Sequence, residues 1–215
     1  MQTTQRRWRK VTWNEPQQRE PRSLRGTLKL FAFLLGWSFL LGSAGYFLLW
    51  AVMPEGWVFG ALYRMFLYHW AHPLQYIGLV SFHYAVVANV GISLPGNPVG
   101  RWPRLVIPLI IILSIVLASP TGGVLWAIHD MQAGYFPEDR RFWEAIRWGA
   151  VEGMTTGWLV ILLSVPYNIL GFVVGYQLTL RAYRMTLRSQ SSSDPTSGAL
   201  QTLAQAGTKL PNKRP

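Results

Sequence analysis

The sequence from Arg141 to Arg188 reads RFWEAIRWGAVEGMTTGWLVILLSVPYNILGFVVGYQLTLRAYRMTLR. Small residues recur at every fourth position in its first part, and two more glycines follow: Ala145, Gly149, Gly153, Gly157, Gly171 and Gly175. At 100° per residue, all six fall on one helical stripe about 120° wide. Glycine weakens a helix in water, whereas in a bilayer small residues at this spacing let helix backbones approach closely. The stretch therefore predicts a membrane helix whose glycine stripe packs against another helix.

The composition of the whole chain indicates an integral membrane protein. Of its 215 residues, 50% are hydrophobic and 13% are charged, which is about half the charged share of a typical soluble domain. The net charge is +11, and most of the excess lies in the two ends. This distribution favours a cytoplasmic location of the ends and attraction to anionic lipid head groups over nucleic-acid binding. The absence of cysteine excludes disulfides and thiolate metal sites.

We expect an all-α membrane protein, a bundle of four transmembrane helices. The expected spans are residues 28–53, 74–94, 104–128 and 153–180, each of them about 20 or more mostly apolar residues long. In the first span, Ser38 and Gly42 form a small-xxx-small pair, a natural partner for the glycine stripe.

Two further segments, at about residues 57–72 and 140–152, are expected to form interfacial amphipathic helices. The first contains Arg64 in its middle, and a charge at that depth of the bilayer is costly. Six crossings, with residues 57–72 as one of the two additional spans, are the alternative.

The two ends of the chain are expected to be disordered and cytoplasmic. They form a basic arm over residues 1–27 and a tail over residues 189–215, flanking a membrane domain of residues 28–188. The arm through Lys29 contains eight lysines and arginines, and the segment from Arg181 contains six. Both ends therefore favour the cytoplasm, which requires an even number of crossings. The expected location is the plasma membrane, as in the inner membrane of a bacterial cell.

Two proline-containing segments interrupt the third and fourth expected spans, SPTGG at Ser119–Gly123 and SVPYN at Ser164–Asn168. A proline frees a backbone carbonyl, and we expect a kink or short unwinding at each segment. Asn168 could bond to a neighbouring helix. Glu152, at the expected outer end of the fourth span, could contact a proton, an ion or a partner, or simply complement the dipole of a helix start.

Histidines are the remaining candidates for chemistry. His69, His72 and His129, together with Asp130, are expected at similar depth near the outer surface, where they are weak candidates for a transition-metal site. His83 lies inside the second span, and an ionisable group in that position is a functional candidate. Motifs of soluble enzymes are absent from the sequence, so no catalytic residue is predicted, no enzymatic activity is expected and the cofactor stays unknown.

Three hypotheses about function follow. The favoured one is an integral membrane subunit or assembly factor that packs against another membrane protein or a second copy of itself. It is favoured because it requires no catalytic or ligand-binding role of the few polar residues. The second is a small transporter or channel component that uses broken helices at Pro120 and Pro166. The third is a metal- or haem-binding membrane enzyme. The lipid bilayer is a partner in each case, and nucleic acid is not.

Overall fold

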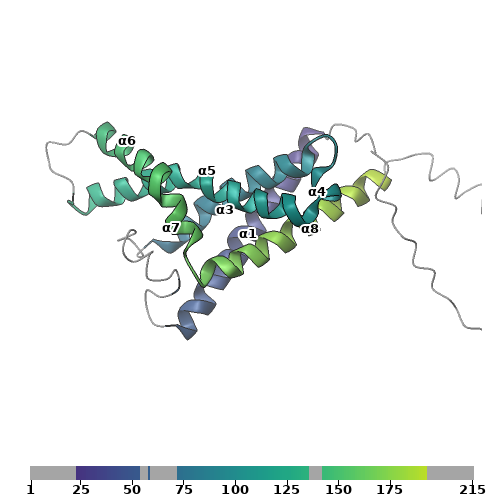
Figure 1. Cartoon of the computed structure of the whole chain (residues 1–215). Coiled ribbons are helices and arrows are strands. Elements are labelled where there is room, and N and C mark those ends of the chain that lie inside the picture. The colour runs from purple at the N-terminus through teal and green to yellow at the C-terminus, as the bar shows by residue number, and fades with distance from the viewer. Residues whose placement is uncertain (1–22, 54–57, 59–71, 136–141, 193–215) are drawn as a thin grey trace, which may run out of the picture.

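The computed structural model describes residues 23–53, 58, 72–135 and 142–192, which form helices joined by short turns, with no strand among them. The expectation of an all-α chain is thus confirmed for the described residues. The helices are α1 (Leu24–Val52), α3 (Pro73–Ser93), α4 (Pro98–Arg101), α5 (Pro103–Gln132), α6 (Phe142–Glu152), the π-helix η1 (Gly153–Gly157), α7 (Trp158–Leu162) and α8 (Tyr167–Ser192). Figure 1 shows their arrangement. Most of the amphipathic segment expected at residues 57–72, with Arg64 and His69, lies outside the described residues.

Three of the described helices, α1, α3 and α5, are long and apolar enough to cross a membrane. At 1.5 Å per residue, the 29 residues of α1 span more than the hydrocarbon core, which is about 30 Å thick. Large apolar side chains on this helix are open to the surroundings; Leu40, Phe47 and Leu48 are each more than half exposed. Such a surface is unfavourable in water and is satisfied by lipid, which indicates a membrane location.

The α5 helix runs without interruption from Pro103 to Gln132, with Pro108 and Pro120 inside it. The alternative of a short unwinding at Ser119–Gly123 was therefore wrong. Prolines are tolerated inside membrane helices when neighbouring groups support the backbone. Here Ser119 and Gly123 pack against the backbone of η1 and α6, which braces this part of α5.

The expected fourth span, residues 153–180, is divided into two pieces. The first piece is the end of one continuous helical stretch that runs from Phe142 to Leu162 and is made of α6, η1 and α7. Residues 163–166 are not helical, and α8 begins at Tyr167. Pro166 accounts for the break, because its ring lacks the N–H that a helix needs and clashes with the preceding turn. The first piece packs against α5, whereas α8 packs mainly against α1.

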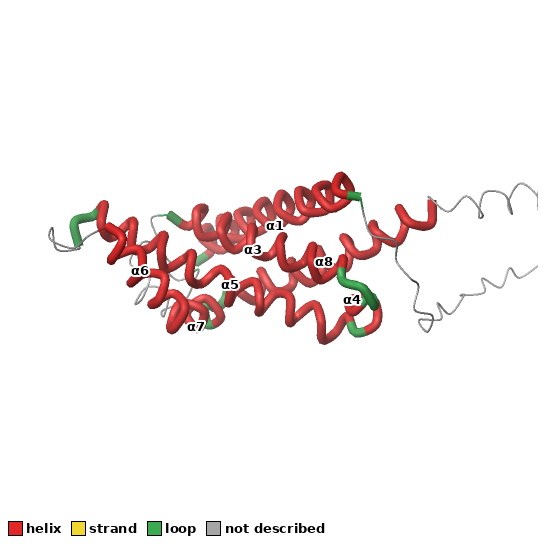
Figure 2. The backbone as a smooth tube through the Cα atoms, turned by 90° about the horizontal axis from the view of Figure 1, so that it is seen from above, coloured by secondary structure: helices red, strands yellow, loops and turns green. Residues whose placement is uncertain are grey.

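The helices share two common ends. Asn89 on α3 donates from Nδ2 to the Thr27 carbonyl of α1 at 3.4 Å, and Asn97 donates from Nδ2 to Tyr183 Oη of α8 at 2.7 Å. The start of α1, the end of α3, the start of α5 and the second half of α8 therefore lie at one end, which we call the α4 end. Both views show α6 at the opposite end, the α6 end (Figures 1 and 2).

The closest helix packing in the structure joins α5 to α6 and η1. Gly149 and Gly153 lie directly against α5 at Gly123, and a Cβ added to Gly123 would be 2.9 Å from the Gly153 Cα and would collide with the Gly149 carbonyl oxygen. Ala127 of α5 and Ala145 of α6 are fully buried on either side. We call this contact the small-residue seam. It requires glycine because the two backbones touch with no side chain between them.

The seam corrects the expected partner of the glycine stripe. Ser119, Gly123 and Ala127 of α5 are spaced by four residues and face the stripe, whereas Gly42 of α1 faces Ile77 and Tyr167. The prediction that Ser38 and Gly42 pair with the first part of the stripe was wrong. The helices α6 and η1 pack against α5, and only α8, after the break, packs mainly against α1.

The later glycines of the stripe face other neighbours. A Cβ on Gly175 would lie 3.3 Å from Ile111 Cδ1 and 3.6 Å from the Tyr84 ring, and a Cβ on Gly171 would meet nothing within 4 Å. The stripe is therefore not one packing surface, since the break turns its second part away from the first.

Alanine at two adjacent glycines of α5 tests the seam. Gly123→Ala places a methyl against the backbone of α6 and η1 and should lower the stability of the protein in detergent by about 1–3 kcal/mol. Gly122→Ala places the same methyl in open space and should be neutral or stabilising, since alanine favours helix by about 1 kcal/mol. Denaturant titration followed by circular dichroism measures both. Equal stability of the two variants would contradict the seam.

Candidate functional site

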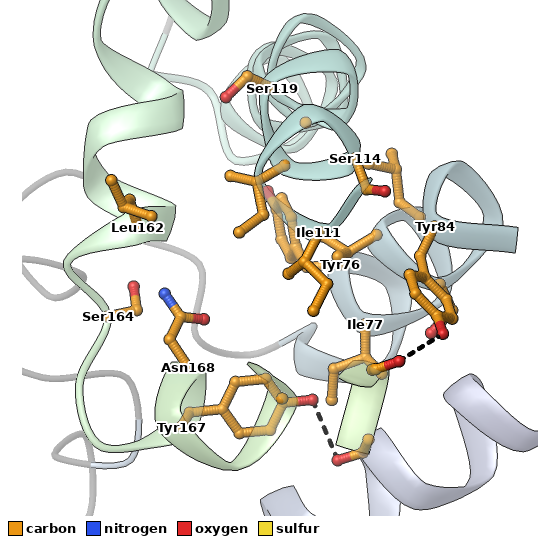
Figure 3. A pocket seen from close by; sticks show the side chains of 18 of the residues that line it. Tyr76, Ile77, Tyr84, Ile111, Ser114, Ser119, Leu162, Ser164, Tyr167 and Asn168 are labelled. Carbon is orange, nitrogen blue, oxygen red and sulfur yellow. Dashed lines mark hydrogen bonds between the residues drawn. The ribbon is translucent and has the colours of Figure 1, made fainter. Parts of the chain in front are cut away.

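A cavity of about 520 Å³ lies between α1, α3, α5, η1, α7 and α8. It forms because the helical stretch that ends at Leu162 packs against α5, whereas α8, which begins at Tyr167, packs mainly against α1. Ser164 of the break and Asn168 in the first turn of α8 line it, and Figure 3 shows them across the cavity from Ser119 of α5. Most of the lining is aliphatic or aromatic. The polar side chains of the lining are Ser38, Tyr76, Ser81, Tyr84, Ser114, Ser119, Trp126, Glu152, Thr156, Ser164, Tyr167 and Asn168.

Two tyrosines fix the position of α8 along the cavity. Tyr167 Oη donates to the Gly42 carbonyl of α1 at 3.0 Å, which the missing side chain of Gly42 makes possible. Tyr84 Oη of α3 donates to the Gly175 carbonyl at 2.8 Å and lies 2.8 Å from Thr179 Oγ1. In the dashed lines of Figure 3, both hydroxyl groups reach across to a neighbouring helix.

Three polar atoms in the cavity wall are buried without a hydrogen-bond partner in the described part of the chain. They are Ser119 Oγ, Tyr76 Oη and Trp126 Nε1. Ser119 is only 1% exposed. A buried polar group without a partner costs about 1–3 kcal/mol, and such groups in a cavity are satisfied when a molecule with complementary polar atoms enters. None of the three was predicted from the sequence as a site residue.

Glu152 lies at the junction of α6 and η1 and lines the cavity. Thr156 donates from Oγ1 to Glu152 Oε1 at 3.0 Å, which orients the carboxylate. The expectation that Glu152 complements a helix start was wrong, because the helix continues through it from Phe142 to Leu162. The π-helix that follows Glu152 is a feature often found at functional sites.

Of the three polar candidates in the sequence, two reach the same cavity. Glu152 and Asn168 both line it, and the Asn168 backbone N–H donates to the Ser164 carbonyl at 2.9 Å. His83 lies outside the lining, and its Nδ1 is 2.9 Å from the Leu79 carbonyl oxygen of the same helix. Glycines of the stripe, Gly153, Gly157, Gly171 and Gly175, also line the cavity.

The histidine cluster is brought together in part. The rings of His72 and His129 are 4.3 Å apart between centroids, and the Tyr76 ring is 6.1 Å from that of His129. Asp130 is buried, as is His129, whereas His69 lies outside the described residues. Within the described ranges, no three His, Asp or Glu side chains are grouped to hold a metal ion.

Comparisons of the chain with protein-family models, with curated proteins and with solved structures find no match. The chemistry of the cavity is therefore the basis on which a function can be proposed.

Alanine at Ser119 distinguishes a binding role from a stabilising one. In the ligand-free protein, Ser119→Ala should leave stability unchanged or raise it by about 1 kcal/mol, because it removes a buried hydroxyl that has no partner. Thr179→Val is the control, because the Thr179 hydroxyl is fully buried and donates to the Gly175 carbonyl at 2.8 Å; it should lose about 0.5–1.5 kcal/mol. A loss at Ser119 as large as that at Thr179 would show that Ser119 supports the fold. Denaturant titration measures both.

Proposed function

We propose that this chain is an integral membrane protein that binds a lipophilic organic cation in the cavity and moves it, as a small transporter does. One observation carries the proposal: the cavity beside the helix break has a mainly apolar wall that holds one carboxylate, Glu152. Among the described residues that line it there is no lysine, arginine or histidine.

The wall matches the chemistry of such a molecule. Its aliphatic and aromatic side chains suit an apolar body. Tyr76 and Trp126 line the cavity, aromatic rings can attract a cation through their faces, and the Glu152 carboxylate supplies the opposite charge. Electrostatic attraction is stronger in such an apolar environment than in water. A bound molecule, or water that enters with it, would also supply partners for the three buried polar atoms of the wall.

The position of the break supports transport over simple binding. Tyr167 is bonded to Gly42, which lies ten residues before the end of α1 at Val52 and so well inside a candidate span. Transporters form their sites where membrane helices are discontinuous near the middle of the bilayer. The hypothesis of an accessory subunit loses its main support, because Gly149 and Gly153 are covered by α5 of the same chain.

The same proposal includes four crossings, with α7 and α8 together as the fourth. The first and last described helices then begin and end on the same side of the membrane. Seven cationic side chains lie toward the α4 end: Arg25, Lys29, Arg101, Arg104, Arg181, Arg184 and Arg188. The described carboxylates, Asp130, Glu144 and Glu152, lie toward the α6 end. By the positive-inside rule the α4 end and both termini are cytoplasmic, in a plasma membrane such as the bacterial inner membrane.

Neutralising Glu152 tests the bound ligand. The purified full chain in detergent should bind tetraphenylphosphonium, an apolar cation, and Glu152→Gln should weaken its affinity at least about tenfold, which corresponds to about 1.4 kcal/mol. Glu144→Gln is the matched control, because Glu144 is an exposed carboxylate on α6 that does not line the cavity. Isothermal titration calorimetry measures all three proteins.

Tetraphenylborate, an apolar anion of similar shape, should bind far more weakly than the cation. Equal affinity for the two ions, or an equal effect of the Glu144 and Glu152 substitutions, would contradict a cation site at Glu152. Binding of the cation without its uptake by proteoliposomes would contradict transport.

Single cysteines test the topology without background, because the chain contains none of its own. The variants are Leu24→Cys and Trp102→Cys at the α4 end, and Tyr135→Cys just after the end of α5. The native side chain at each of these positions is more than half exposed. An impermeant maleimide added to intact cells should label only position 135. The helices α1, α3 and α5 lie between positions 24 and 135, so three crossings place these positions on opposite sides of the membrane. Labelling of both positions from the same side would contradict that topology.

A further inference from the structure

A second concavity lies between α1 and α8, near the α4 end, with a volume of about 360 Å³. Its lining is made of Phe33, Trp37, Leu178, Arg181, Arg184, Met185 and Arg188. We call it the arginine groove. It shares no lining residue with the cavity described above. We infer that the arginine groove binds one anionic phospholipid, with the phosphate held by the arginines and an acyl chain lying along the aromatic side chains.

Three arginines of the groove lie on one face of α8. Arg181, Arg184 and Arg188 follow the i, i+3, i+7 spacing and so lie on one face of α8. Each guanidinium presents a planar set of N–H donors that matches the oxygens of a phosphate. Among the described residues, the lining of the groove contains no carboxylate. An anion is therefore the ligand that the charge of the groove complements.

The apolar part of the groove favours an anion that carries a hydrocarbon chain. Trp37 is 46% exposed and Met185 is 49% exposed, so both present apolar surface beside the arginines. Leu178 is the groove residue of α8 farthest from the α4 end, and Arg188 is the nearest to it. Leu178 thus lies toward the membrane interior and Arg188 toward its surface, in the order of the acyl chain and head group of a phospholipid.

Other cations at the α4 end supply an internal comparison. Arg101 and Arg104 do not line the groove, and the Arg101 guanidinium lies 6.0 Å from the centroid of the Trp102 ring. A general attraction of anionic lipid to this end of the protein would depend on these arginines as much as on Arg181 and Arg184. A specific site would depend on the groove alone.

Trp37 is a built-in probe for the occupant. The full chain in neutral detergent is titrated with phosphatidylglycerol or phosphatidylcholine carrying brominated acyl chains, which quench tryptophan fluorescence on contact. The contribution of Trp37 is the difference between the native chain and its Trp37→Phe variant. We expect this contribution to be quenched by phosphatidylglycerol at a concentration about tenfold lower than by phosphatidylcholine, because each cation near a membrane surface favours the anionic lipid.

Substitution of the arginines separates the groove from its surroundings. Arg181→Gln with Arg184→Gln should raise the half-quenching concentration of phosphatidylglycerol about tenfold, whereas Arg101→Gln with Arg104→Gln should change it less than about twofold. Circular dichroism confirms that both variants keep their helical content. Should the first fail to fold, Arg181→Lys with Arg184→Lys keeps the charge, and weaker quenching then still reports loss of the guanidinium contacts.

Three results would overturn the inference. They are equal quenching by the two lipids, equal effects of the two arginine pairs, and displacement of the lipid by millimolar glycerol phosphate, which would identify a site for soluble phosphate. The cation site at Glu152 is tested by a different ligand and different residues, so either proposal can fail while the other stands.

Discussion

The structure depends on backbone contact between α5 and the helix formed by α6 and η1. Helices in a bilayer gain little from burying apolar side chains, since lipid is as apolar as leucine, so close van der Waals packing has to hold them together. At Gly123, Gly149 and Gly153 this packing reaches the limit at which no Cβ can be added without moving the backbone. The seam holds the chain against α5 up to Leu162. To reach α1 afterward, the chain has to leave the helix, and residues 163–166 provide the break.

The cavity is a consequence of that divergence. A single straight helix from Gly153 to Leu180 would have packed along one partner and filled the space. Instead, α7 remains with α5 while Tyr167 and Tyr84 bond α8 to α1 and α3. Polar side chains of the neighbouring helices, such as Ser119 and Trp126 of α5, line the space between the two pieces.

Hydropathy predicted the helical class and four long apolar spans, and three of the described helices are long and apolar enough to cross a membrane. Neither hydropathy nor residue spacing predicted the partner of the stripe. Ser119, Gly123 and Ala127 of the partner have the spacing of four residues that close packing needs, but Pro120 led to the prediction of a helix break at the same place. Glu152 and Asn168 were identified as polar residues in an apolar setting, and both line the cavity. Ser119 and Tyr76 could not be identified in this way, because whether a hydroxyl has a partner depends on the angle between helices.

The π-helix between α6 and α7 has a mechanical consequence. A π-turn holds one more residue than an α-turn, and each residue corresponds to about 100° of rotation about a helix axis. If the extra residue moved along the helix or were absorbed, α7 would turn by about 100° while the contact of α6 with α5 stayed in place. Leu162, the residue of α7 that lines the cavity, would then change its position in the wall. Such a screw-like rotation of one short helix would change the lining of the cavity with no separation of the helices that enclose it.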